Sequence, residues 1–150
     1  RKDGFKMKDY TKLNEYLSDL HVLNVKLHNL HWNVIGKRFV RLHEYTEELY
    51  DDLFEKFDEI AELIKMRGEA PLAKVADYLK NTSIQELDKD SYTCDEVLKY
   101  LEEDYTKLKK LATDIRNTAD DEGDFEVVAI MEDHIAGYSK TLWFVKAMLS

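Results

Sequence analysis

The sequence predicts an all-α protein: a bundle of four long helices with a short extra helix in the connection between the second and third. Three observations predict this fold. Apolar residues recur at helical spacing over four long segments, no segment alternates as a half-buried strand does, and the chain has only five glycines and one proline. At 150 residues, with 44% hydrophobic and 35% charged residues, the chain is long enough to bury a core. We therefore expect residues 1–150 to form a single domain.

The first two helices are expected to form an antiparallel hairpin. The first runs from about Asp9 to Val34, and Gly36 is well placed to end it. Its core face carries Leu13, Leu17, Leu20, Asn24, Leu27, His31 and Val34, with Leu23 and Leu30 beside them. The second runs from about Phe39 to Arg67, and its apolar stripe is Leu42, Leu49, Leu53, Ile60 and Ile64.

The sequence of the second half of the chain predicts a connection and two more long helices. Pro71 suits the first turn of a short helix in the connection, which contains Leu72, Val75, Ala76 and Leu79. The third helix starts near Thr93, which has capping-box spacing to Glu96, and its core face is Val97, Leu98, Leu101, Leu108, Leu111 and Ile115. The fourth starts near Asp124, with Val128, Ile135, Leu142, Val145 and Leu149 inward. Four helices of this length, with one long crossover, describe a ferritin-like bundle.

Composition and charge argue against several classes of partner. The formal net charge of −9 repels phosphate backbones, and only the first dozen residues are mildly basic: Arg1, Lys2, Lys6, Lys8 and Lys12 against Asp3 and Asp9. No apolar run approaches the ~20 residues that a membrane span needs. Because Cys94 is the single cysteine, an intrachain disulfide is excluded, and we expect a reducing, cytoplasmic location.

Two histidines and three acids gather in the predicted hairpin: His31, His43, Glu47, Asp58 and Glu62. Imidazole and carboxylate together suit iron and other first-row metals. At about 100° per residue, the last four project into one quadrant of the second helix. Yet His43 and Asp58 are about 22 Å apart along the axis, whereas metal–ligand bonds are only ~2 Å. Either there are two separate sites, or a second copy of the helix runs antiparallel across a two-fold axis.

The usual single-chain di-iron bundle is a rival interpretation, but its Glu-x-x-His motif does not occur in this sequence. Taken one at a time, each of these residues has a plainer explanation. Acidic pairs four residues apart are commonly solvated helix faces, and a lone core histidine is commonly just hydrogen-bonded. The functional interpretation depends on the residues that flank the set.

The flanks resemble a known family. The string His31-Trp32-Asn33-Val34-x-Gly36-x-x-Phe39-x-x-Leu42-His43, followed by Glu47, Tyr50, Asp58, Ala61 and Glu62, closely resembles the Dps family. These are the small ferritins named for DNA protection during starvation. The resemblance extends to Gly68, Pro71, the short connecting helix and Trp143, so it spans nearly the whole chain.

The resemblance implies a ferroxidase and iron-storage shell. Dps subunits assemble as homo-dodecamers, oxidise Fe(II) to Fe(III), usually preferring hydrogen peroxide, and store ferric oxide. On the matching positions, His31 and His43 would come from one subunit and Asp58 and Glu62 from its partner at a two-fold interface. Glu47 would be a weaker or second-metal ligand. Since zinc also accepts histidine and carboxylate, it is a second candidate metal.

Two other functions stay open at this point. The first is a DNA-binding, nucleoid-compacting structural protein with incidental metal binding, which the mildly basic N-terminus does not favour. The second is a metal-binding stress or adhesion protein with little turnover.

The acidic start of the fourth helix also has two interpretations. Its acids are Asp120, Asp121, Glu122, Asp124 and Glu126. They either favour the helix dipole or form a funnel for Fe(II) at a three-fold pore, as the resemblance implies. Relatives often carry Thr and Asp at the positions of Val127 and Ala129, so in this chain Asp121 or Asp124 would have to attract the iron.

Overall fold

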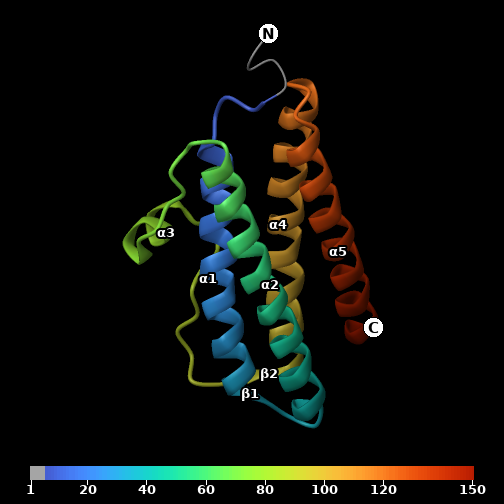
Figure 1. Ribbon diagram of the computed structural model, residues 1–150. Helices are drawn as coiled ribbons and strands as arrows, with labels where there is room; N and C mark the ends of the chain where they lie inside the picture. Colours follow the sequence, from blue (N-terminus) through green and yellow to red (C-terminus); the bar gives the residue numbers. More distant parts are fainter. Residues whose placement is uncertain (1–5) are drawn as a thin grey trace.

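Two helical hairpins pack side by side in the computed structural model, which describes residues 6–150 (Figure 1). The first hairpin contains α1 (Thr11–Asn33) and α2 (Phe39–Met66), and the second contains α4 (Cys94–Asp121) and α5 (Phe125–Leu149). The connection between the hairpins runs along the bundle and carries α3 (Val75–Asn81) on the outside of α1. This is the predicted all-α, ferritin-like arrangement with one long crossover.

The predicted ends of the long helices agree with the structure to within two residues. The capping box at the start of α4 is present: the Thr93 side chain accepts from Glu96 N, and the Glu96 side chain accepts from Thr93 N. The Asp124 side chain caps α5 by accepting from Val127 N. Both caps satisfy backbone donors that a helix start leaves unpaired.

Two features of the connections differ from the prediction. Gly36 does not end α1, because the helix stops at Asn33 and a two-residue strand β1 (Val34–Ile35) intervenes. This strand pairs in parallel with β2 (Tyr92–Thr93), so the exit from α1 is tied to the entry into α4. Strands of two residues have no detectable alternation, which is why the sequence pattern gave no sign of them.

The short helix α3 also begins later than predicted. It starts at Val75, four residues beyond Pro71, so the proline is not in its first turn. Its buried residue is Tyr78, whereas Val75 and Leu79 are 61% and 49% exposed. A stretch of seven residues is too short for its apolar spacing to identify the buried face.

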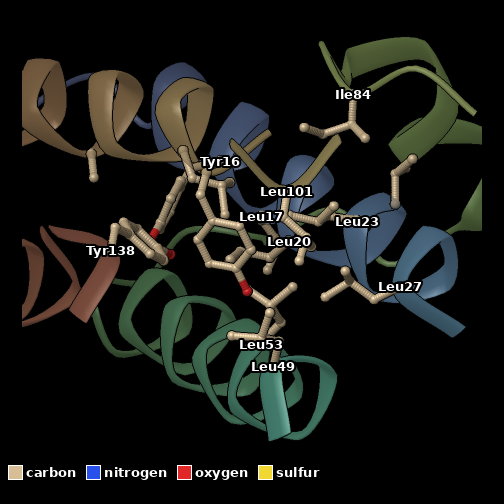
Figure 2. Packing of buried hydrophobic residues seen from close by; sticks show 14 of the residues in the cluster. Tyr16, Leu17, Leu20, Leu23, Leu27, Leu49, Leu53, Ile84, Leu101 and Tyr138 are labelled. Atoms are coloured by element: carbon tan, nitrogen blue, oxygen red, sulfur yellow. The ribbon is translucent and has the colours of Figure 1, made fainter. Parts of the chain in front are cut away.

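The core lies where the two hairpins face each other. Figure 2 shows leucines of α1 packed against Leu49 and Leu53 of α2, Leu101 of α4 and Ile84 of the connection. The predicted stripe of α2 is buried throughout. On α5 the predicted Leu142 and Val145 are buried, whereas Val128, Ile135 and Leu149 are only partly buried. The rest of the buried face consists of Val127, Met131, His134 and Tyr138. Two of these residues, His134 and Tyr138, carry polar groups into the core.

Only part of the mildly basic N-terminal segment lies within the residues that the structure describes. Arg1, Lys2 and Asp3 lie outside the described residues. Within residues 6–150, no helix is both long and apolar enough to cross a membrane.

Candidate metal site

The α1–α2 hairpin brings His31 and His43 into direct contact. His31 lies in the last turn of α1 and His43 in the second turn of α2. Their imidazole rings stack with centroids 3.7 Å apart and an angle of 15° between the planes. His31 is buried and His43 is half-buried. The tight connection of residues 34–38 places the end of one helix beside the start of the other.

Reciprocal hydrogen bonds fix the tautomer of each histidine. His31 Nδ1 donates to the carbonyl of His43 at 2.6 Å, and His43 Nδ1 donates to the carbonyl of His31 at 2.8 Å. Because a carbonyl can only accept, each Nδ1 carries a proton, and in the tautomer with a proton on Nδ1 alone the lone pair of Nε2 is free. A histidine whose Nδ1 bonds to a carbonyl is oriented to bind a metal through Nε2.

The second of these bonds also has a local structural role. The carbonyl of His31 is among the last four of α1, which have no partner within the helix. His43 supplies that partner from the next helix. The same contact therefore ends α1, joins it to α2 and orients a potential ligand.

Glu47 is the third predicted residue that the hairpin brings to this place. Its Oε1 lies 3.9 Å from Nε2 of His31, and its side chain is 57% exposed. With metal–ligand bonds of ~2 Å, two donors of one ion lie at most about 4 Å apart. The distance between Glu47 Oε1 and His31 Nε2 therefore fits two ligands of one ion, and the exposed Glu47 side chain has room to move.

Asp58 and Glu62 lie elsewhere on the same chain. Both are exposed residues of the second half of α2, separated from His43 by most of the helix. Among residues 6–150, no group of three or more histidine, cysteine or acidic side chains is arranged to hold a metal ion within one chain. The five predicted residues thus fall into two clusters, one with the histidines and Glu47 and the other with Asp58 and Glu62.

Two further residues lie near the histidines: Thr46, which was missed at the level of the sequence, and Tyr50, which was named there only as part of the family resemblance. Buried Thr46 donates to Leu42 O at 2.8 Å and lies 3.3 Å from Nδ1 of His31, so it packs against the protonated side of the ring. The ring of Tyr50 meets that of His31 edge-on at 5.3 Å. Thr46 follows His43 by three residues and therefore lies on the same face of α2, which is the signal that could have identified it.

His28 supports Tyr50 from its other side. The two rings stack with centroids 3.7 Å apart, and His28 Nδ1 donates to Asn24 O at 2.8 Å. Burial and the nearby carboxylates of Glu47 and Asp51 raise the pKa of Tyr50 above its usual 10. The tyrosine is therefore neutral at pH 7, and its ring packs edge-on against that of His31.

At the opposite end of the bundle, the structure removes Asp124 from the candidates for attracting iron. Its carboxylate is buried and receives two hydrogen bonds from Arg67, at 2.5 and 2.7 Å, and one from Met7 N at 2.8 Å. Burial by itself would raise the pKa of Asp124, but the hydrogen bonds from Arg67 and the backbone lower it below its usual range. Asp124 is a structural anchor, and Asp121, which is exposed, stays as the predicted acid of this turn.

Known proteins share this chain's sequence and fold along nearly its whole length. Residues 10–150 match the family model of the ferritin-like domain. The DNA protection during starvation protein of Helicobacter pylori is 36% identical over 144 residues, which cover 96% of this chain and all of the relative. The crystal structure of antigen TpF1 from Treponema pallidum is similar with a TM-score of 0.92 at 31% identity, covering 93% of this chain and 90% of that one.

A third relative carries a description of its chemistry. The DPS protein from Vibrio cholerae, described as a member of a broad superfamily of ferritin-like diiron-carboxylate proteins, has a TM-score of 0.89 at 33% identity. The similarity covers 93% of this chain and 87% of that one. With the family model, the sequence relatives and the fold in agreement, this chain belongs to the Dps family of ferritin-like proteins.

Proposed function

We propose that this chain is the subunit of a ferroxidase and iron-storage shell, which oxidises Fe(II), preferably with hydrogen peroxide, and sequesters the ferric product. The observation that carries the proposal is the reciprocal histidine pair. Two imidazoles in contact, each with Nδ1 bonded to a carbonyl, leave their Nε2 atoms as potential metal donors beside Glu47. Family membership supports the iron chemistry, since one Dps relative is described as a diiron-carboxylate protein.

The site is completed by a second chain in this proposal. His31, His43 and Glu47 form one half-site, and Asp58 and Glu62 form the other, on the same helix but about 22 Å away. If two copies of α2 run antiparallel across a two-fold axis, each histidine half-site faces the acidic half-site of its partner. An isologous contact makes two identical sites per dimer. The homo-dodecamer would be built from such pairs.

Each residue has a distinct part in the proposed reaction. The imidazoles of His31 and His43 hold Fe(II) without adding charge, and the carboxylates of Asp58 and Glu62 favour the product because they stabilise the higher charge of Fe(III). Glu47, more exposed than the histidines, would bind a second iron or a weaker position. Each peroxide takes two electrons and two protons and leaves as two waters, so two Fe(II) are consumed.

Removing Fe(II) and peroxide together protects the cell, because these two reagents generate hydroxyl radical. The net charge of −9 suits a protein that attracts cations. A cytoplasmic location is part of the proposal and agrees with the single buried free cysteine.

The direct test is anaerobic titration of the protein with Fe(II) and hydrogen peroxide. We expect about two iron atoms oxidised per peroxide, from the electron balance above, with the ferric product remaining soluble. A His31→Ala, Asp58→Ala double variant should lose the fast phase, whereas Asp114→Ala, which removes an exposed acid of α4, should keep it. Unchanged kinetics in the double variant would overturn the site assignment.

A mixing experiment tests whether the site is shared between chains. Subunits carrying only His31→Ala and subunits carrying only Asp58→Ala are each expected to be inactive. When they are unfolded and refolded together, mixed pairs contain one intact site and one site that lacks both residues. Recovered activity supports two half-sites on different chains. Continued inactivity of a correctly assembled mixture would contradict the proposal.

The alternative of a DNA-compacting protein is distinguished by its dependence on salt. A DNA-binding protein would retard DNA in a gel and lose affinity steeply as salt rises, because it displaces counterions from phosphates. We expect no retardation at moderate salt, given the excess of acidic over basic residues (31 against 22). A strong, salt-sensitive shift would favour the DNA function.

The remaining alternative is a metal-binding protein with little turnover, which would hold zinc. Histidine and carboxylate bind both zinc and iron. Calorimetric titration of the apoprotein with each ion, beside the oxidation assay, separates the two functions. Zinc binding without any iron oxidation would support a metal-binding protein with little turnover.

A further inference from the structure

A chain of hydrogen-bonded polar side chains crosses the core at a distance from the proposed metal half-sites. Tyr16 of α1, His134 and Tyr138 of α5 are all buried, with at most 1% of each residue exposed. Glu59 of α2 joins them from the surface, where its side chain is 48% exposed. Figure 2 shows Tyr16 and Tyr138 within the packed leucine core. The proposed iron chemistry uses none of these residues.

The donor and acceptor of each hydrogen bond between these side chains can be assigned by starting from Glu59. Its carboxylate can only accept, so Nε2 of His134, 2.6 Å from Oε1, carries a proton. Burial lowers the pKa of His134 below its usual 6.5 despite the opposing carboxylate, so the ring is neutral at pH 7 and its Nδ1 is an acceptor. Tyr16 therefore donates its hydroxyl proton to Nδ1 at 2.8 Å, and its oxygen accepts from the hydroxyl of Tyr138.

A third buried tyrosine in the same core provides an internal comparison. The ring of Tyr105, on α4, lies edge-on to that of Tyr138 with centroids 5.6 Å apart. Its hydroxyl is buried and has no hydrogen-bond partner among residues 6–150. Of these two neighbouring phenols, Tyr16 and Tyr105, Tyr16 alone is bonded to a base.

This difference matters for oxidation. A phenol that loses one electron becomes a very strong acid, and oxidation is easy only where a base can take the proton. Burial raises the pKa of Tyr16 well above its usual 10, so it cannot ionise beforehand, and the proton has to leave with the electron. Tyr105 is equally buried, but residues 6–150 offer no acceptor for its proton.

The carboxylate of Glu59 favours the proton transfer from Tyr16 to His134. When His134 takes the proton it becomes an imidazolium held by the carboxylate of Glu59, so the step creates an ion pair and not a lone buried charge. The charge of Asp133 also favours the imidazolium, whereas the ammonium of Lys56, which is paired with Asp52 at 2.5 Å, opposes it.

We propose that Tyr16 is a one-electron donor site that quenches strong one-electron oxidants such as hydroxyl radical, with His134 as its proton acceptor. The step is balanced. One electron passes from Tyr16 to the oxidant, reducing hydroxyl radical to hydroxide, which takes a proton from solvent to become water. The phenol proton moves to Nδ1 of His134, and a neutral tyrosyl radical remains, hydrogen-bonded by Tyr138. This activity goes beyond iron oxidation and does not depend on it.

The test uses azide radical, generated by pulse radiolysis, on the intact iron-free protein. Oxidation is expected to begin at the exposed indoles of Trp32 and Trp143, each 67% exposed, and to migrate to Tyr16. Optical and freeze-quench electron paramagnetic resonance spectra should show a long-lived tyrosyl radical. Tyr16→Phe should abolish it, and the matched buried variant Tyr105→Phe should retain it. An identical long-lived radical in wild type and Tyr16→Phe would overturn the proposal.

The role of His134 needs a readout that structural damage alone would not produce. His134→Gln keeps a polar side chain but removes the base, so the Tyr16 radical should form more slowly or decay faster by an order of magnitude or more. Wild-type protein should also show slower radical formation in D2O than in H2O, because the proton moves with the electron. Circular dichroism verifies that the variants are folded. Wild-type lifetimes in His134→Gln, or the absence of a solvent isotope effect, would remove His134 as the acceptor.

Discussion

Hydrogen-bond partners decide what each polar residue of this protein does. His31 and His43 are potential ligands because their Nδ1 atoms are occupied by each other's carbonyls. Asp124 belongs to the same residue class as Asp58, yet its carboxylate is committed to Arg67 and a helix start. The residue type gives the available chemistry, and the partner determines whether that chemistry is free for use.

Removing one member of the Arg67–Asp124 pair should destabilise the fold strongly. In Arg67→Met the carboxylate of Asp124 stays buried without its cation, which costs about 3 kcal/mol or more in the free energy of unfolding. Arg116→Met breaks an exposed pair with Glu132 and should cost at most about 1 kcal/mol. Urea unfolding of both variants measures the difference, and equal losses would show that the buried pair is not the anchor we describe.

Acidification below about pH 6.5 should lower the stability of the folded chain, because buried His134 and half-buried His21 must take up protons. Burial lowers the pKa of both His134 and His21 below their usual 6.5. Between the folded and unfolded pKa values the unfolded state binds more protons, so the free energy of unfolding rises with pH. The contribution is complete above the unfolded pKa and is lost as pH falls towards the folded one.

Urea unfolding at a series of pH values between about 5 and 8 measures this dependence. His134→Gln removes one of the two titrating groups and should flatten the curve, whatever its effect on absolute stability. A wild-type curve that is flat over this interval would contradict the lowered pKa of both histidines.

Among the structural elements, the turn between α1 and α2 matters most for the proposed site. It runs through β1, which pairs with β2, and then through Gly36, whose φ of +125° lies in the left-handed region. A Cβ at Gly36 would lie 3.3 Å from Sγ of buried Cys94. The glycine, the strand pair and the cysteine together fix how α1 meets α2, and therefore how the two histidines stack.

Two glycine substitutions should change stability in opposite directions. Gly36→Ala forces a side chain into a left-handed backbone and against Cys94, so it should destabilise by about 1 kcal/mol or more. Gly137→Ala lies within α5, where an added Cβ meets nothing within 4 Å among residues 6–150, and should stabilise by roughly 0.5–1 kcal/mol. Thermal unfolding compares the two. Stabilisation by Gly36→Ala would disprove the tight turn.

In the molecule as a whole, the proposed activity depends on assembly. One chain separates Asp58 and Glu62 from the histidines, and no group of three ligands forms within residues 6–150. In the proposed arrangement, the α1–α2 hairpin presents both halves of a site that a single copy does not close.

The mass of the protein in solution tests whether the proposed activity depends on assembly. A closed shell of the proposed kind has about twelve times the chain mass of 17.7 kDa, and sedimentation or light scattering would detect it. A monomer that oxidises iron at full rate would contradict the intersubunit site. A shell that fails to oxidise iron would separate assembly from catalysis.

By itself the sequence determined the four long helices, because periodic burial over about 25 residues is a strong and local signal. It also determined the family resemblance and the separation of His43 from Asp58, which follows from the helical rise alone. Short elements were less predictable: Pro71 was placed in the first turn of α3, and β1 and β2 went undetected, because a few residues carry too little pattern.

The tertiary structure decided everything that depends on contacts between distant segments. The tautomers of His31 and His43, the burial of Asp124 against Arg67, and the alignment of Tyr16 with His134 and Glu59 each join residues from different helices. Periodicity specifies which side of a helix faces inward. It does not specify which polar atoms meet there, because the angle and register between helices are set by packing of the whole core.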